Sequence, residues 1–405
     1  MPKLQLSPSF TPHSFPVMAS SESSQAAFHI ASLDGMRAIA IMIVFLSHAG
    51  LSHVVPGLFG VTVFFFLSGY LITTLLRMEC ERHGSISLGQ FFLRRTLRIL
   101  PPFYLVLAAV AMLTAFHILP GGFHGQAFMA QALFGANYWE ISGGVQPPGT
   151  EIFWSLAVEE HFYLLFPFFY LALRRWLPEH RKQFALLMTL CASVLAWRML
   201  LVHHFSVVDL HSGTAHHPRT CHATDTRLDG LLYGCALAVW GNPALDPTRI
   251  RRSHWLWLAL PLCFALLVAT FVIRSVPFRE TWRYTLQGLA LMPIFITVIR
   301  YPDALPLRFL NWRWVSRLGV LSYAFYLTHA LLLSLVQHWL PAPAGLSQVN
   351  LILVRGVTAL LLSLAVSAAV HRWVEQPFLR LRRRLGSSPR TSSHKQSAEL
   401  ALNHI

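Results

Sequence analysis

The first residues that could do chemistry are an arginine and a histidine in one apolar stretch, LDGMRAIAIMIVFLSHAG. Arg37 and His48 are eleven residues apart, which puts them on nearly the same helix face about 16 Å apart along the axis. Ionisable side chains inside a bilayer are costly and are therefore functional candidates. Arg37 alone is better explained by a side chain that extends to the lipid headgroups. The pair on one face favours a functional site, in which a neutral imidazole can accept a proton from a hydroxyl.

A second cluster is basic and lies in FFLRRTLRILPPFY. Arg94, Arg95 and Arg98 fall within about one helical turn, so their planar guanidinium groups could hold phosphates together. For any single arginine, ordinary positive charge beside a membrane span is the better explanation. Pro101 and Pro102 follow directly and favour a shaped site over a flexible one.

A third cluster is acidic and lies inside the apolar stretch WSLAVEEHFYLLFP. Glu159 and Glu160 are consecutive and point to different faces of a helix, so we expect at most one of them to face the first span. That carboxylate could orient an imidazole, as carboxylates do in hydrolytic triads. The alternative is a buried ion pair that fixes the helix register.

Three further motifs carry candidate substrate-binding residues. GVTVFFFLSGYLIT places the hydroxyl of Tyr70 beside small residues, for which close helix packing is the favoured explanation. TRLDGLLYG is expected to place Arg227 and Asp229 at the outer edge of a short helix, where surface ion pairing competes with sugar binding. LSYAFYLTH adds His329, a second histidine in a predicted span.

The composition is that of an integral membrane protein. The 405 residues are 54% hydrophobic and 12% charged, about half the charged fraction of soluble domains. The sequence predicts an all-α, polytopic transmembrane helical bundle with about ten membrane spans. The predicted spans are Arg37–Leu51, Leu58–Leu76, Ile99–Leu119, Ile152–Leu173, Phe184–Val202, Leu228–Trp240, Trp255–Ile273, Trp282–Ile299, Leu318–Leu340 and Asn350–Val370.

The distribution of arginine predicts the orientation of the bundle. Loops rich in arginine alternate with poorer ones, and residues 117–151 contain no lysine or arginine. The positive-inside rule then predicts that both termini are cytoplasmic. We expect disordered cytoplasmic tails at 1–30 and 386–405 and one transmembrane domain at 31–385. We attribute the net charge of +15 to contact with anionic membrane lipids rather than with nucleic acid.

Neither a disulfide framework nor a metal site is predicted. The five cysteines are scattered and form no CxxC pair. A segment from His203 to His222 is rich in histidine, but it lacks the spacing of known metal motifs. We therefore expect no bound metal.

Seven motifs, taken in order, resemble those of acyltransferase family 3, membrane enzymes that acylate cell-surface sugars. The correspondence runs from about Ser32 to Leu385. The motifs are LDGMRAIA with its downstream histidine, GVTVFFFLSGYLIT, FFLRRTLRILPP, WSLAVEEHFYL, RLDGLLYG, LSYAFYLTH and VEQPF. One departure is Thr62, where the family often has Asp.

The resemblance implies an O-acyltransferase of the bacterial inner membrane. Such an enzyme moves an acyl group, usually acetyl, from cytoplasmic acyl-CoA to a hydroxyl of a glycan or related acceptor at the outer face. Acyl-CoA is then a donor substrate, and no permanently bound cofactor is implied. The implied catalytic residues are His48, Glu159 and Arg37, and the implied donor-binding residues are Arg94, Arg95 and Arg98.

The mechanism and two rival functions stay open from the sequence. His48 would act as a base on the acceptor hydroxyl or be acylated transiently, and Glu159 would orient it or balance its charge. One rival is a secondary transporter that uses Arg37, His48 and Glu159 as a proton or anion path, although no inverted repeat is visible. The other is a non-catalytic partner in a glycan-assembly complex, whose ionisable residues would tolerate substitution.

Overall fold

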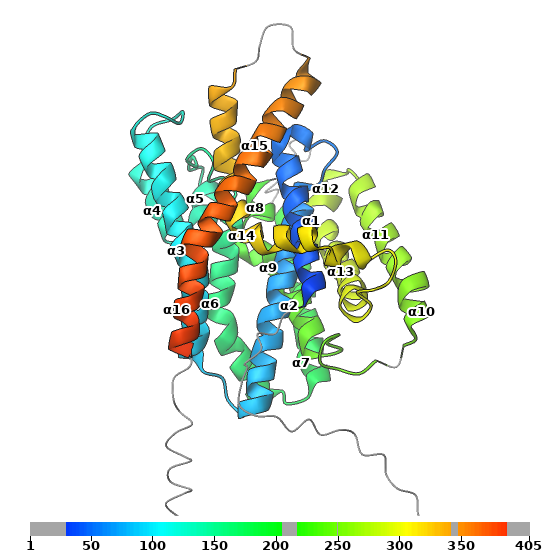
Figure 1. Ribbon diagram of the computed structural model, residues 1–405. Helices are drawn as coiled ribbons and strands as arrows, with labels where there is room; N and C mark the ends of the chain where they lie inside the picture. Colours follow the sequence, from blue (N-terminus) through cyan, green and yellow to red (C-terminus); the bar gives the residue numbers. More distant parts are fainter. Residues whose placement is uncertain (1–29, 205–216, 249, 342–346, 387–405) are drawn as a thin grey trace, which may run out of the picture.

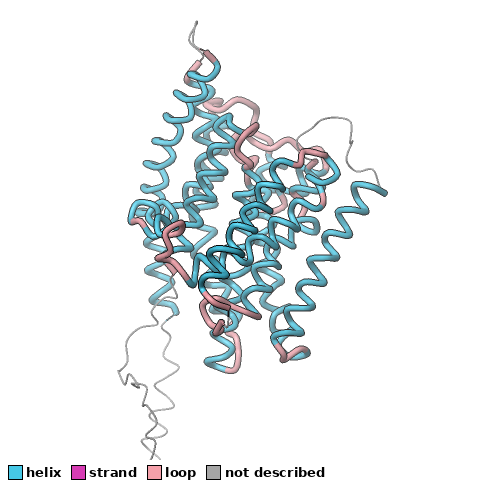
Figure 2. Tube along the Cα trace, turned by 90° about the vertical axis from the view of Figure 1, so that its right-hand side faces the viewer, coloured by secondary structure: helices cyan, strands magenta, loops and turns pink. Residues whose placement is uncertain are grey.

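The computed structural model describes residues 30–204, 217–248, 250–341 and 347–386. These residues form helices joined by short loops, and no strand occurs among them (Figure 2). The long helices lie side by side, with α4 and α16 at one edge and α10 and α11 at the opposite edge (Figure 1). The protein is an all-α polytopic bundle, as predicted. The predicted tails lie outside the described residues, apart from residues 30 and 386.

The α-helices of the described chain are α1 (Ala31–Leu46), α2 (Gly57–His83), α3 (Leu88–Ala115), α4 (Gly125–Ala132), α5 (Ala136–Ile141), α6 (Phe153–Trp176), α7 (His180–Met199), α8 (Pro218–Cys221), α9 (Thr224–Val239), α10 (Arg252–His254), α11 (Leu260–Val272), α12 (Val276–Glu280), α13 (Trp282–Arg300), α14 (Arg313–Trp339), α15 (Gln348–Val370) and α16 (Gln376–Gly386). Four π-helical turns extend or join them: η1 (Ser47–Leu51), η2 (Leu200–His204), η3 (Trp255–Ala259) and η5 (His371–Glu375). A 3₁₀ turn, η4 (Arg308–Asn311), precedes α14.

Nine helices of the described chain are long and apolar enough to cross a membrane. They cover Ala31–Leu51, Gly57–His83, Leu88–Ala115, Phe153–Trp176, His180–His204, Arg252–Val272, Trp282–Arg300, Arg313–Trp339 and Gln348–Arg382. Each contains most of one predicted span. The remaining predicted span, Leu228–Trp240, forms as α9, which has 16 residues and is too short to belong to this group.

The short helix α9 lies at the centre of the bundle, where it packs against α2, α7 and α13. Thirteen of its sixteen residues are buried. Two glycines let its backbone cross that of α2 closely. A Cβ atom at Gly234 would clash with the carbonyl oxygen of Phe66, and one at Gly69 would clash with that of Leu231. Small residues at a helix crossing are a common way for membrane helices to associate.

Replacing Gly234 with alanine is expected to destabilise the protein by about 3 kcal/mol, because the new methyl group would force α2 and α9 apart. Thermal unfolding of the detergent-solubilised protein measures the change. The matched control is Gly89→Ala in α3, where no atom lies within 4 Å of an added Cβ. There the substitution should be neutral or stabilising, since alanine favours helix. A Gly234→Ala variant as stable as the control would contradict the close crossing.

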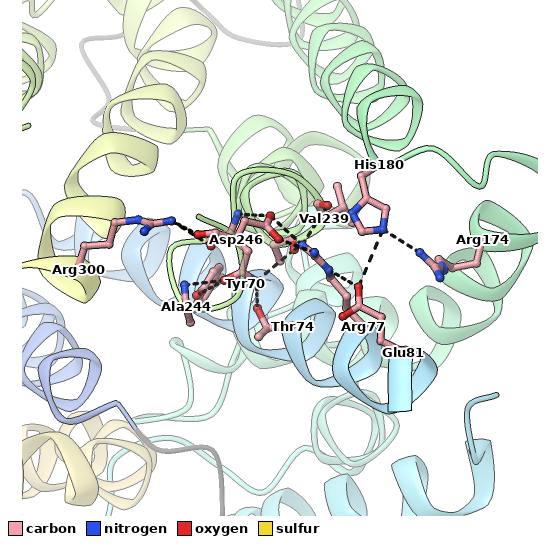
Figure 3. A network of polar contacts seen from close by, with 12 residues as sticks. Tyr70, Thr74, Arg77, Glu81, Arg174, His180, Val239, Ala244, Asp246 and Arg300 are labelled. Atoms are coloured by element: carbon pink, nitrogen blue, oxygen red, sulfur yellow. Dashed lines mark hydrogen bonds and ion pairs between the residues drawn. The ribbon is translucent and has the colours of Figure 1, made fainter. Parts of the chain in front are cut away.

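A network of polar side chains lies at the C-terminal end of α9 (Figure 3). Arg77 of α2 donates to the carbonyl oxygens of Ala238 and Val239 over 3.1 and 3.2 Å. The same guanidinium group makes two bonds to Asp246, of 3.0 and 2.5 Å. A cation at the last carbonyls of a helix is favoured by both hydrogen bonding and the helix dipole. The network therefore caps α9 and ties it to α2.

The predicted role of Tyr70 in substrate binding has no support from its position in this network (Figure 3). Tyr70 is fully buried, and its hydroxyl donates to Asn242 Oδ1 over 2.8 Å. Asn242 in turn donates to Thr74 Oγ1 over 2.9 Å. The hydroxyl of Tyr70 therefore joins α2 to the loop after α9, and this role is structural.

Asp246 lies in the loop after α9, outside the membrane spans. Burial opposes its ionisation, but the hydrogen bonds and charge of Arg77 outweigh burial and lower the pKa of Asp246. A lowered folded-state pKa contributes stability above the ordinary aspartate value of about 4, and this stability is lost as the pH falls through the folded value. We expect Asp246→Asn to cost about 2 kcal/mol at neutral pH, less than a fully buried pair because Asp246 is 21% exposed.

Thermal unfolding across a pH series checks this prediction. The difference between wild type and Asp246→Asn should be constant at neutral pH and shrink in acid. The control is Glu179→Gln, which breaks a pair with Lys182 whose side chains are 61% and 59% exposed, and should change nothing measurable. A difference that persists unchanged in acid would show that the carboxylate charge is not its cause.

Candidate active site

A cavity of about 270 Å³ lies among α1, α2, α3, α6 and α14. It brings together the three charged clusters that are far apart in the sequence. The charged residues that line it are Asp34, Arg37, Arg95, Arg98, Glu159 and Glu160. Ionisable groups gathered around one cavity at membrane depth mark it as the candidate site.

The arginines of the cavity differ in their partners. Arg37 donates to Asp34 Oδ1 over 3.1 Å, one turn earlier in α1. The guanidinium carbon of Arg95 lies 5.2 Å from the ring centre of Tyr163 and 5.8 Å from that of Phe91. Within the described chain, neither Arg95 nor Arg98 makes a hydrogen bond or an ion pair within 4 Å, although Glu159 and Glu160 line the same cavity. Their N–H groups are therefore available to an anionic ligand.

Arg94 does not line the cavity. Its side chain is 40% exposed and donates to Glu79 Oε2 over 3.0 Å. Consecutive residues on a helix point about 100° apart, so Arg94 and Arg95 face different surroundings. The structure thus brings two of the three predicted donor-binding arginines into the cavity and leaves the third at the surface.

Both consecutive glutamates line the cavity, whereas at most one was expected to face the first helix. Glu159 accepts hydrogen bonds from Ser68 Oγ over 3.1 Å and from Tyr163 Oη over 2.8 Å. Glu160 makes no hydrogen bond within the described chain. No contact joins Glu159 to His48, so the prediction that Glu159 orients this imidazole has no support from geometry.

His48 instead pairs with a second histidine. It lies in η1 at the end of α1, its side chain is exposed, and its Nδ1 is 3.2 Å from His329 Nε2. His329 is fully buried, and its Nδ1 is 2.8 Å from the carbonyl oxygen of Tyr326. A carbonyl oxygen can only accept, so His329 carries its proton on Nδ1 and accepts through Nε2. His48 then donates through Nδ1, and its Nε2 keeps a free lone pair.

His48 is not among the residues that line the cavity, but Tyr326 links the two. Tyr326 lines the cavity, and its hydroxyl lies 2.6 Å from Ser155 Oγ. Its ring centre lies 5.6 Å from that of His329. Tyr326 thus lines the cavity and packs near His329, while His48 and His329 are not among the residues that line it. His329, predicted to bind substrate, is placed as the buried partner of His48.

Arg227 and Asp229 lie in the first two turns of the short helix α9, but both are fully buried, so surface ion pairing is wrong for them and their predicted role in sugar binding has no support from geometry. Asp229 pairs with Arg198 of α7 over 2.7 Å, and both side chains are inaccessible. Arg227 donates to Thr62 Oγ1 over 3.0 Å, and its guanidinium carbon lies 4.0 Å from the ring centre of Tyr284. The two residues brace α9 against its neighbours and do not contact the cavity.

Sequence reasoning missed several polar residues of the cavity. Asp34 lies three residues before Arg37, and Tyr163 lies four residues after Glu159, so helical spacing could have found both. Ser155 and Tyr326 are 171 residues apart in the chain and come from α6 and α14. Their contact depends on tertiary packing, and no local signal predicts it.

The fold and the site define a polytopic helical membrane protein with a cavity lined by charged residues and a histidine pair next to Tyr326 of its lining. Residues 30–372 match the family model described as an acyltransferase domain, and the chain belongs to this acyltransferase family.

The chain is similar to known O-acetyltransferases. It is 32% identical over 317 residues to the peptidoglycan O-acetyltransferase OatA of Listeria monocytogenes serovar 1/2a, a match that covers 74% of this chain and 49% of the relative. It is 30% identical over 324 residues to the O-acetyltransferase OatA of Staphylococcus aureus strain NCTC 8325, with 74% and 50% covered. The chain thus spans about half the length of these relatives. No solved structure matches it.

Proposed function

We propose that this protein is a multi-pass O-acyltransferase of the inner membrane that moves an acetyl group from cytoplasmic acyl-CoA to a glycan hydroxyl at the outer face. The observation that carries the proposal is the cavity in which Arg37, Arg95 and Arg98 meet, in a chain of the acyltransferase family. The names of the similar proteins support acetyl as the acyl group and peptidoglycan as the first acceptor to test.

The arginines fit the donor because coenzyme A carries several phosphate charges. Arg95 and Arg98 offer N–H groups that no described carboxylate occupies, and planar guanidinium groups bind phosphates through two bonds. They lie near the start of α3, beside the arginine-rich loops that the positive-inside rule assigns to the cytoplasm. In this proposal the donor enters there, and its acyl arm extends toward Tyr326.

In this proposal, the Nε2 lone pair of His48 catalyses the acyl transfer. As a base, it accepts the proton of the acceptor hydroxyl while the hydroxyl oxygen attacks the thioester carbonyl carbon. The C–S bond breaks, and the thiolate leaves and is protonated. As a nucleophile, the same nitrogen attacks first and carries the acyl group to the acceptor. Both routes need the proton of His48 held on Nδ1, which the bond to His329 provides.

The test uses the purified protein in detergent, with acetyl-labelled acetyl-CoA and a soluble peptidoglycan fragment. We expect labelled ester on the glycan and release of free coenzyme A, both without any ion gradient. A transporter would show no chemical turnover under these conditions, and a non-catalytic partner would not either. Absence of turnover from a protein that binds acetyl-CoA would therefore overturn the proposal.

A further inference from the structure

Glu160 differs from the other two carboxylic acids that line the cavity. Asp34 pairs with Arg37, and Glu159 accepts from two hydroxyl groups. Glu160 lines the same cavity and is half-buried, but it makes no hydrogen bond and no ion pair within the described chain. Its carboxyl oxygens are therefore available to a ligand or to a proton.

Glu160 occupies an intermediate level of the cavity on α6. Later in this helix, the ring centre of Tyr163 lies 5.2 Å from the guanidinium carbon of Arg95. Earlier in the helix, Ser155 Oγ lies 2.6 Å from the hydroxyl of Tyr326. At 1.5 Å per residue, the two levels are about 4.5 Å and about 7.5 Å from Glu160 along the axis. Glu160 thus lies between the proposed phosphate site and the tyrosine toward which the acyl arm extends.

The charges around the cavity balance one another before a donor binds. Helices α1, α3 and α6 supply three arginines and three carboxyl groups: Arg37, Arg95, Arg98, Asp34, Glu159 and Glu160. Helices α6 and α14 add the hydroxyls of Tyr163, Tyr323 and Tyr326, and the described residues of α2 add no titratable group to the lining. The phosphates of coenzyme A bring excess negative charge, which is costly where the dielectric constant is low. Uptake of a proton by one carboxylate offsets part of that excess.

Glu160 is the carboxylate best placed to take up this proton. The guanidinium group of Arg37, 3.1 Å from Asp34, stabilises the charge of that aspartate. Hydroxyl groups that donate over 3.1 and 2.8 Å stabilise the charge of Glu159. Glu160 has neither kind of donor within the described chain, and it follows Glu159 directly. A protonated carboxyl group in its position is also a proton donor that faces the path of the acyl arm.

We propose that Glu160 carries the proton of the leaving thiol: it takes up a proton when acyl-CoA binds and donates it to the sulfur as the C–S bond breaks. The thiolate becomes a thiol, and Glu160 becomes a carboxylate again. The proton therefore enters from water with the donor and leaves with free coenzyme A, while the proton of the acceptor hydroxyl passes separately to His48. This inference rests on the proposed function, because it supplies the proton that the thiolate of that reaction requires.

Calorimetry of donor binding tests the proton uptake without turnover. The probe is S-acetonyl-CoA, a thioether that keeps the phosphates and the arm of acetyl-CoA but has no thioester to cleave. It is titrated into the full-length protein in detergent at neutral pH, in buffers that differ in ionisation enthalpy. We expect wild type to take up about one proton per analogue bound and Glu160→Gln to take up almost none. The matched control in the same cavity, Glu159→Gln, should keep the wild-type uptake.

Steady-state kinetics test the transfer of the proton to sulfur. We expect Glu160→Gln to lower kcat with acetyl-CoA about 10²-fold, as for the loss of a general acid, without raising the KM for acetyl-CoA. Acetyl thionitrobenzoate releases a more acidic thiol that needs no proton, so its rate should fall less than about tenfold. Glu160→Asp restores a carboxyl group and should recover part of kcat. The control Glu179→Gln, at an exposed pair, should match wild type.

Other results would overturn the inference. Binding of the analogue by wild type without proton uptake would exclude Glu160 as a proton carrier and leave the proposed function standing. A higher KM for acetyl-CoA with unchanged kcat in Glu160→Gln would make the carboxylate a ligand of the donor's amide groups. Equal rate losses with both thioesters and lower thermal stability would make it a structural residue. Proton uptake by a wild type that never consumes acetyl-CoA would instead contradict the proposed function, and the transfer step with it.

Discussion

Replacing His48 with alanine is expected to abolish acyl transfer, with kcat reduced about 10³-fold or more. Both routes that the proposed function allows use its Nε2 lone pair, and a positioned base or nucleophile contributes on this scale. His48 is exposed at the end of α1, so its removal leaves no cavity and should not prevent folding. Steady-state kinetics with acetyl-CoA and a glycan acceptor measure the loss, and donor binding verifies that the variant is folded.

A related prediction concerns His329, the buried partner of His48. We expect His329→Ala to lower kcat about 10²-fold with little change in the KM for acetyl-CoA, because His48 loses the acceptor that holds its Nδ1 proton. A merely structural role for His329 would instead lower thermal stability and move both kinetic constants. A His48→Ala variant with kcat within tenfold of wild type would remove this histidine from the mechanism.

Replacing Arg95 or Arg98 with alanine is expected to raise the KM for acetyl-CoA roughly 30-fold each. A charge-assisted hydrogen bond to phosphate contributes about 2 kcal/mol, and neither guanidinium group makes a hydrogen bond or a close ion pair within the described chain. The change should fall mainly on the KM, because these contacts are made in the ground state as well as in the transition state. Titration of acetyl-CoA binding provides an independent measure.

Arg94 provides a matched control in the same helix. It carries the same charge one residue away, but it is 40% exposed and already paired with Glu79. We expect Arg94→Ala to leave the KM for acetyl-CoA within about twofold of wild type, as for other surface pairs. Equal effects at positions 94, 95 and 98 would indicate general attraction of the donor by surface charge, and would count against a specific phosphate site in the cavity.

The fold was largely predictable from the sequence, because hydropathy over about twenty residues reports whether a helix can span a bilayer. Each of the nine long helices contains most of a predicted span. The exception was α9, whose residues are shielded by protein rather than lipid, so its length is not set by the bilayer. Its glycines, which weaken a helix in isolation, serve the close crossing with α2.

The cavity was predictable only in part. Charged residues inside apolar stretches pointed to Arg37, Arg95 and Glu159, because a bilayer makes such residues expensive to keep. The same reasoning could not separate residues that line a cavity from residues that brace helices. Arg227 and Asp229 are also charged residues in an apolar stretch, yet Asp229 pairs with Arg198 and Arg227 packs against Tyr284. Nor did spacing within one helix reveal that His48 would meet His329, 281 residues away.

The central claim is that one bundle receives acyl-CoA at its arginine-lined end and the acceptor at the end that carries His48. Sealed proteoliposomes of known orientation test it most directly, with labelled acetyl-CoA and a membrane-impermeant glycan each added to a chosen side. Labelled ester is expected only when acetyl-CoA is on the side of the loop between α2 and α3 and the glycan is on the opposite side. Equal labelling with both substrates on the same side would contradict the account.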